Sequence, residues 1–363
     1  MRWLPSRRCL KIAGIVAGCI AVLAALPVLW IETRCQSAHQ QPSAANASLL
    51  AAADRREETN SYLTYPKWSI VHAYEDLAAV TRRRSESSYD YLGAITHYWS
   101  SLCSISQLAS QHRPISTDHK VMLHVAGLRF AAEMGIKGLY EKTLGRITAL
   151  IRGQSHTPED EFALAIADDY AKFLAHAPWY EYPFGGKLWR FWADTPLWGG
   201  NFVRKIERRA ALTLEWGTKS IYAQLRTAGA SASPAPLRIK SVVTNLGPTD
   251  LAADPRIKLV EMLGSASIIE TDRYSTFADI MTGMAKRSAN FIEIAGNQNI
   301  LVTVLAPMET TTVPEGAALL FQVPVAARPG WQRLALDVKV PELLELLRSI
   351  QRSGLLLEHV YDY

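Results

Sequence analysis

The sequence lacks the short motifs by which common enzyme classes are recognised. It has no phosphate-binding loop, no dinucleotide-binding glycine pattern and no nucleophile elbow of the Gly-x-Ser-x-Gly type. Cysteine is scarce, with four in 363 residues, and none of the four has the spacing of a metal-ligand set. The net charge of +5 is small for this length and no basic arm is present, which argues against nucleic-acid binding. We therefore predict no cofactor, no metal site and no catalytic residue.

The strongest positive signal is an apolar run from Ile12 to Ile31. As a helix these 20 residues would cover about 30 Å, the thickness of the hydrocarbon core of a bilayer. Residues 1–11 carry four basic side chains, whereas residues 32–51 carry one. By the positive-inside rule, 1–11 form a cytoplasmic basic end and 12–31 an uncleaved, single-pass signal anchor of a bacterial inner membrane. The bulk of the chain is then periplasmic.

Two alternatives for this N-terminal segment remain open. A cleaved signal peptide shares the basic end and the apolar run, although the run is long and no small-x-small site precedes the polar boundary at Glu32. A lipoprotein signal is the second, because Val16-Ala17-Gly18-Cys19 resembles a lipobox with an acylated cysteine. Both alternatives also place the rest of the chain outside the cytoplasm.

Two cysteines, Cys35 and Cys103, follow the apolar run. An oxidising compartment permits a disulfide between them, which would tie the start of the exported part to the domain behind it. Two unpaired thiols are the alternative, because spacing alone does not establish the geometry that a disulfide needs.

The exported part divides by composition into two domains and two linkers. Apolar residues recur at helical spacing up to residue 228, and short β-favouring runs follow residue 237. The C-terminal order of helix, hairpin, strands, helix and strand predicts a ferredoxin-like α/β domain, with the hairpin over Phe291 to Leu305. The predicted α+β organisation is a flexible linker over 32–60, a mainly α-helical domain over 61–228, a linker over 229–236 and the ferredoxin-like domain over 237–363.

One predicted helix, from Val121 to Ile151, carries charges of alternating sign at Arg129, Glu133, Lys137 and Glu141. A spacing of four residues places them on one stripe, and Val121, Val125, Ile136 and Leu139 fall on the opposite side. We expect a soluble amphipathic helix with the charged stripe in water and the apolar side in the core. A second membrane span is disfavoured, because a lipid-exposed helix does not tolerate this many charges.

Residues 178 to 202 are unusually rich in aromatic side chains. Three interpretations stay open for them: a cap on the helical core, a membrane-docking loop, or a wall of a ligand or partner site. The candidate membrane or partner surface consists of Trp179, Tyr180, Tyr182, Phe184, Trp189, Arg190, Phe191, Trp192 and Trp198. Further basic residues flank it at Lys187, Arg204, Lys205, Arg208 and Arg209.

Acidic residues offer an alternative, catalytic hypothesis. In an envelope hydrolase or transferase at the membrane surface, Glu181 with Asp194, or the pair Asp168 and Asp169, would act as acid and base. A third group, His72, Glu75 and Asp76, would share one face of a helix and could support metal binding or acid–base chemistry. The same combination of residues also occurs on ordinary exposed helices.

Four segments resemble those of uncharacterised bacterial single-pass inner-membrane proteins. They are Tyr65-Pro66-Lys67-Trp68, Tyr98-Trp99-Ser100-Ser101-Leu102-Cys103, Lys137-Gly138-Leu139-Tyr140-Glu141 and Leu357-Glu358-His359-Val360-Tyr361-Asp362-Tyr363. The resemblance implies an inner-membrane location and carries no activity to this chain. The sequence thus favours a non-enzymatic, membrane-anchored binding or scaffold protein whose partners are the lipid bilayer and an envelope protein. A ligand sensor that acts through a membrane partner is the third hypothesis.

Overall fold

The computed structural model describes most of the chain. The described residues are 7–36, 48–57, 59–112, 115–153, 155–177, 179–228, 238–247, 249, 251, 253–273, 275–287 and 289–362. The first six residues, residues 37–47 and 58 of the predicted linker over 32–60, and all of the predicted linker over 229–236 lie outside this description.

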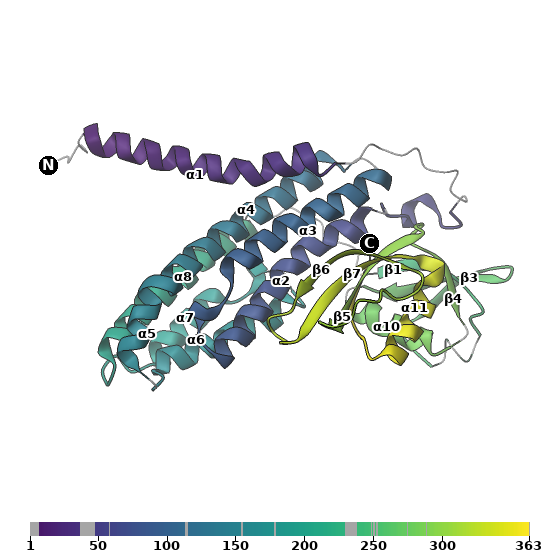
Figure 1. Ribbon diagram of the computed structural model, residues 1–363. Coiled ribbons are helices and arrows are strands. Elements are labelled where there is room, and N and C mark those ends of the chain that lie inside the picture. Colours follow the sequence, from purple (N-terminus) through teal and green to yellow (C-terminus); the bar gives the residue numbers. More distant parts are fainter. Residues whose placement is uncertain are drawn as a thin grey trace.

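The N-terminal half is helical, as the apolar spacing predicted, and forms an elongated bundle with one further helix, α1, beside it (Figure 1). Its helices are α1 (Arg7–Arg34), α2 (Thr59–Arg83), α3 (Tyr91–His112), α4 (Thr117–Tyr140), α5 (Arg146–Arg152), α6 (Pro158–Leu174), α7 (Phe184–Asp194) and α8 (Phe202–Ala228). The short elements are η1 (Ala52–Asp54), η2 (Glu86–Ser88), a π-helical turn η3 (Glu141–Gly145) that joins α4 to α5, and η4 (Trp179–Glu181).

Local sequence signals explain several helix boundaries. Helix α6 begins behind Thr157, whose hydroxyl accepts a hydrogen bond from the Asp160 amide, while the Asp160 carboxylate accepts one from the Thr157 amide. This capping box satisfies two amides that a helix start otherwise leaves unpaired. Helix α7 is an addition to the prediction, because its glycines and the preceding Pro183 are typical of a loop.

The C-terminal half contains two antiparallel four-stranded sheets. The first has the order β2-β3-β1-β4 and the second β6-β7-β5-β8. The first sheet consists of β1 (Arg238–Thr244), β2 (Lys258–Leu263), β3 (Ala266–Asp272) and β4 (Asn290–Ile294), with α10 (Ser275–Ala285) before β4. The second consists of β5 (Asn299–Pro307), β6 (Ala317–Pro324), β7 (Trp331–Lys339) and β8 (Leu356–Tyr361), with η5 (Val340–Glu342) and α11 (Leu343–Ser353) before β8.

The two sheets are structural repeats of one unit, in which three strands are followed by a helix and a fourth strand. The register shifts also correspond, since each repeat has one between its second and third strands and one between its first and last. A ferredoxin-like domain instead has a single sheet in the order βαββαβ. The mixed α and β class is therefore confirmed, and the ferredoxin-like topology was wrong.

Two details of the strand prediction explain this error. Strands β2 and β3 were missed, because β2 is an edge strand with mixed polar and apolar residues and no alternation to detect. The predicted hairpin from Phe291 to Leu305 is absent, because β4 and β5 belong to different sheets. The turn at Ala295 and Gly296, both with positive φ, carries the chain from one repeat to the next.

A segment of the N-terminal half packs on the sheet of each repeat. Residues 48–57 pack on the first sheet, where the Glu293 carboxylate accepts hydrogen bonds from the Leu49 and Leu50 amides. Helix α2 packs on the second sheet, where Ser61 donates to the Tyr361 carbonyl at 2.6 Å. The second part of the predicted linker is thus fixed, and the two halves of the protein form a continuous body.

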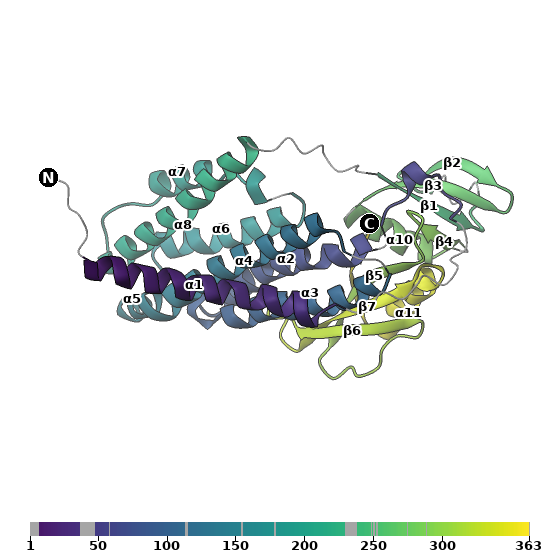
Figure 2. The same ribbon diagram turned by 90° about the horizontal axis from the view of Figure 1, so that it is seen from above.

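Helix α1 is attached to the bundle at its C-terminal end. Cys35 and Cys103 form a disulfide that joins the end of α1 to α3. Glu32 accepts hydrogen bonds from Lys120 at 2.8 Å and interacts with His124 at 2.9 Å, both on α4. From there α1 diverges from the bundle (Figure 1), although the two overlap in direction when seen from above (Figure 2).

We searched the described residues for a helix with the length and apolar character of a membrane span, and found none. The described side chains of α1 begin at Ile15, and Ile15, Val22, Leu23, Leu26 and Leu29 are each more than half exposed. The anchor over 12–31, and with it the inner-membrane location, stays a prediction.

Candidate interaction surface

The charged stripe of α4 faces inward, opposite to the prediction from the sequence. It pairs with a complementary stripe on α8, which runs antiparallel to α4. Three successive contacts are Glu133 to Lys219 at 2.6 Å, Lys137 to Glu215 at 2.8 Å, and Glu141 at the start of η3 to Arg208 through two hydrogen bonds of 2.8 and 2.9 Å. Because the charges alternate in sign on both helices, each contact joins opposite charges in this one register. The prediction of a solvated charged stripe was therefore wrong.

A second group of buried ion pairs lies nearer the start of α8. Arg204 contacts Asp160 at 2.8 Å, and Lys205 and Arg209 both contact Glu159 at 2.9 Å. These side chains are almost completely buried. Four of the basic residues that flank the aromatic segment, Arg204, Lys205, Arg208 and Arg209, thus belong to the interior of the bundle.

The electrostatic environment keeps the carboxylates of Glu215 and Asp160 ionised. Burial by itself would raise the pKa of Glu215, but the ammonium groups of Lys137 and Lys219 outweigh burial and lower the pKa to about 2. Burial likewise opposes ionisation of Asp160, and Arg204, the Thr157 amide and Arg152 lower its pKa to about 2. A buried ion pair is tolerated when such partners compensate for the lost water.

The outer sides of the same helices are apolar and exposed. We call the following residues the α4–α8 face. On α4, η3 and α5 they are Val121, Met122, Val125, Ile136, Leu139, Leu144, Ile147, Leu150 and Ile151, and on α8 they are Phe202, Val203, Ile206, Leu214, Ile221, Tyr222 and Leu225. Leu150 is 74% exposed and Leu214 is 71% exposed. On this side the ion pairs lie beneath the surface, next to buried apolar residues such as Leu123, Phe130 and Met134, and the outward side is hydrocarbon. We call this arrangement the inversion of the bundle.

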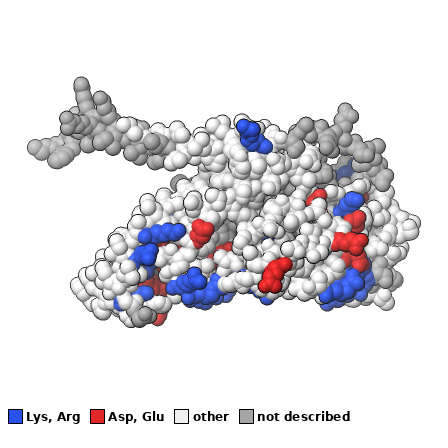
Figure 3. Space-filling view, in the orientation of Figure 1, with Lys and Arg blue, Asp and Glu red and all other residues white. Residues whose placement is uncertain are grey.

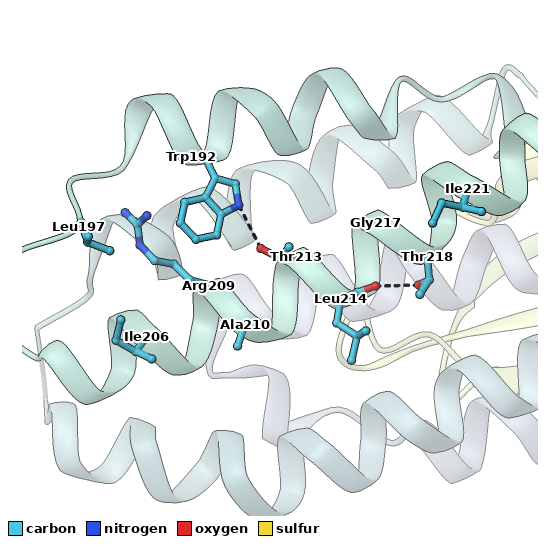
Figure 4. A pocket seen from close by; sticks show the side chains of 10 residues that line it. All are labelled: Trp192, Leu197, Ile206, Arg209, Ala210, Thr213, Leu214, Gly217, Thr218 and Ile221. Atoms are coloured by element: carbon cyan, nitrogen blue, oxygen red, sulfur yellow. Dashed lines mark hydrogen bonds between the residues drawn. The ribbon is translucent and has the colours of Figure 1, made fainter. Parts of the chain in front are cut away.

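Two grooves follow α8 on either side of its exposed ridge. The groove between α8 and α4–α5 has a volume of about 1090 Å³, with Ile136, Leu144 and Ile206 among the apolar residues that line it. The groove between α8 and α7 has a volume of about 560 Å³ and is lined mainly by apolar atoms (Figure 4). In this second groove the Trp192 indole donates to Thr213 at 3.1 Å and closes one wall.

The aromatic segment divides into an interior part and a surface part. Tyr182, Phe184 and Phe191 are buried in the bundle, and Trp179 and Tyr180 are half-buried. Trp189, Arg190, Trp192 and Trp198 are exposed, with Trp189 at 73% and Trp198 at 74%. The interpretation as part of the core thus holds for the first group. Among the exposed tryptophans, Trp192 lines the α7–α8 groove, Trp189 lies on α7, and Trp198 lies in the loop that follows α7.

The carboxylates of the catalytic hypothesis do not form a common site. Asp168 forms ion pairs with Arg82 and Lys172, whereas the neighbouring Asp169 contacts Lys187 at 2.8 Å and accepts a hydrogen bond from Tyr182. Glu181 and Asp194 lie exposed at opposite ends of the aromatic segment. On the third cluster, His72 pairs with Glu75 at 3.1 Å, while Asp76 accepts a hydrogen bond from the Ala327 amide. Asp168, Asp169, Glu75 and Asp76 thus each have a structural partner of their own.

Sequence reasoning did not identify the α4–α8 face. The periodicity of α8 contains both stripes, with apolar residues at 203, 206, 210, 214, 221 and 225 and charged ones at 204, 208, 215 and 219. Periodicity shows that a helix has two faces and does not show which one is buried. The signal that was present is the matched alternation of charge on α4 and α8, which only a pairwise comparison of the two helices would reveal.

Figure 3 shows the distribution of charge over the side of the molecule that faces the viewer in Figure 1. Charged side chains gather over the C-terminal sheets and at the far end of the bundle, and the middle of the visible face is largely uncharged (Figure 3). Comparison with known proteins adds no assignment: no family model matches the chain, and no curated protein or solved structure is significantly similar to it.

Proposed function

We propose that this chain is a membrane-anchored binding or scaffold protein of the bacterial cell envelope, and that the α4–α8 face is its contact surface. In this proposal α1 crosses the inner membrane with its N-terminus in the cytoplasm, and the bundle and both sheets are periplasmic. The resemblance to single-pass inner-membrane proteins and the disulfide, a bond typical of oxidising compartments, support this location.

One observation carries the proposal, namely the inversion of the bundle along α4 and α8. Sixteen large apolar side chains are exposed on this face, and covering each would contribute about 1 kcal/mol if half of its surface leaves water. A water-soluble protein gains this energy by turning the stripe inward, whereas here the inward positions are occupied by ion pairs and by other apolar residues, such as Phe130 and Trp216. Contiguous apolar surfaces of this kind mark sites of contact with a protein or a membrane.

The double-sheet half then serves as the part that the bundle holds at a fixed position. Residues 48–57 and α2 clamp its two sheets, and the Tyr62 hydroxyl adds a hydrogen bond of 2.7 Å to Asp337 on the second sheet. A rigid connection of this kind suits a scaffold, because it transmits the position of the bundle to whatever the sheets contact.

Photo-cross-linking in cells tests the proposal. A photoreactive amino acid replaces Leu214 on the face, and the matched control replaces Lys172 on α6, whose side chain is 75% exposed on a charged surface. We expect adducts with lipid or protein from position 214 and few from position 172. Absence of any adduct at 214, in a chain that fractionates with the membrane, would overturn the assignment of this face.

A further inference from the structure

The two helices that build the α4–α8 face have long stretches without an exposed charge. From Val121 to Tyr140 on α4, and from Phe202 to Leu225 on α8, every charged side chain is buried or half-buried. These 20 and 24 residues correspond to about 30 and 36 Å of helix. A protein partner rarely covers so long a surface without a polar contact, because most protein interfaces have a polar rim.

The residues that border the face favour an anionic lipid surface. Along α4 after Asp118, along η3 and α5, and from Phe202 to Leu225 of α8, the fully exposed charged side chains are Lys142 and Arg146, both basic. Basic side chains beside an apolar surface are attracted to anionic headgroups.

Aromatic side chains at the border point to the same surroundings. Trp198 stacks on Phe202 at the start of α8, with ring centroids 5.6 Å apart, and both rings are exposed. Tryptophan prefers the headgroup layer, where its ring is buried and its N–H stays hydrated. Trp189 on α7 is exposed in the same way.

The position of α1 relates this face to the predicted anchor. The disulfide and the Glu32 contacts hold the end of α1 against α3 and the start of α4. From this attachment α1 diverges from the bundle in Figure 1, and in the view from above it projects along the same edge of the molecule as α4 and α3 (Figure 2). A helix that enters the membrane from this attachment brings the neighbouring α4 surface to the bilayer, and its exposed apolar side chains continue the apolar character of the face.

We propose that the occupant of the α4–α8 face is the lipid bilayer itself, so that the bundle lies along the periplasmic leaflet. The inference rests on the proposed function and names the surface that the face contacts. The ridge of α8 enters the acyl-chain region between the two grooves, and acyl chains fill the grooves. Lys142 and Arg146 lie among anionic headgroups, and the charged residues that line the groove between α8 and α4–α5, such as Glu133, Lys137 and Lys219, keep their ion-pair partners, as ionisable groups at membrane depth do in general.

Reconstitution of the full chain into vesicles of defined composition tests the inference. The photoreactive residue at 214, or at Leu150 on α5, is activated in vesicles of phosphatidylethanolamine and phosphatidylglycerol, with position 172 as control. We expect lipid adducts from 214 and 150, at least ten times more abundant than from 172. In anionic vesicles the variant K142A/R146A should lose most of the adduct at 150, and in phosphatidylcholine vesicles it should match the parent. Circular dichroism verifies that each variant is folded.

The outcomes separate this inference from the proposed function. Lipid adducts at 214 and 150 support both. Adducts only with a second copy in vesicles, or only with another protein in cells, would preserve a contact function for the face and overturn the bilayer as its occupant. No adduct in either setting would overturn both proposals. An adduct yield at 150 that does not respond to K142A/R146A in anionic vesicles would contradict the role given to the basic residues.

Discussion

The contact between Glu141 and Arg208 gives the sharpest test of the inverted bundle. Both side chains are 2% exposed, and two hydrogen bonds connect them. Replacing Glu141 by Gln leaves the guanidinium buried with one fewer compensating charge. Removing one partner of a buried ion pair costs about 3 to 5 kcal/mol. Because Asp160 and Glu86 lie 3.5 and 3.6 Å from Arg208, we expect a value near the lower end, about 3 kcal/mol.

The companion variant replaces both partners by apolar residues, as E141L/R208M. If the loss in E141Q arises from an uncompensated buried charge, the double variant should recover most of it, since a buried ion pair often exchanges for an apolar pair at little cost. A matched control is E161Q, because Glu161 is exposed on α6 and a surface substitution changes stability by less than about 0.5 kcal/mol.

Thermal and urea unfolding of the full chain in detergent, followed by circular dichroism, measure these differences. For a domain of this size, 3 kcal/mol corresponds to a decrease in Tm of about 6 to 12 °C. A decrease in E141Q no larger than that in E161Q would show that Glu141 is hydrated. The charged stripe would then face water, and the assignment of the α4–α8 face would fail with it.

Three further predictions concern other contacts of the bundle. Closing the 68-residue loop between Cys35 and Cys103 should stabilise the fold by up to about 4 kcal/mol, so C35S/C103S should unfold at a lower urea concentration than the oxidised parent, and at the same one as the reduced parent. The pKa of Glu215, lowered to about 2, predicts a stabilisation that is complete above about pH 5 and lost as the pH falls towards 2. The variant K137M/E215M should therefore show a weaker decrease in Tm between pH 5 and pH 3 than the parent. A decrease equal to that of the parent would contradict the pairing. A methyl group on Gly127 would lie 2.3 Å from the ring of Tyr98, whereas one on Gly135 meets nothing within 4 Å. Calorimetry should therefore show G127A destabilised by about 1 to 3 kcal/mol and G135A slightly stabilised. Equal effects of the two substitutions would show that α3 and α4 do not pack closely at Gly127.

The helical half was largely predictable because its signals are local. The Thr157 hydroxyl before Pro158 predicts the start of α6, and the structure confirms it with a complete capping box. The disulfide was predicted as one of two alternatives, and the structure forms it, since the ends of α1 and α3 meet only in the folded bundle. The C-terminal topology was not predictable in this way, because the edge strand β2 has no periodicity and strand order depends on contacts between residues far apart in the sequence.

The sequence by itself determined the elements with strong local patterns: the apolar segment over 12–31, the helices of the bundle, and the two opposite stripes on α4 and α8. Only the tertiary structure decided which stripe is buried. An amphipathic helix has the same periodicity whether its charged side faces water or a complementary helix, so the choice depends on the alternating charges of α4 meeting those of α8 in register. That pairing turns sixteen large apolar side chains outward, and so places the candidate interaction surface where the sequence had predicted the core.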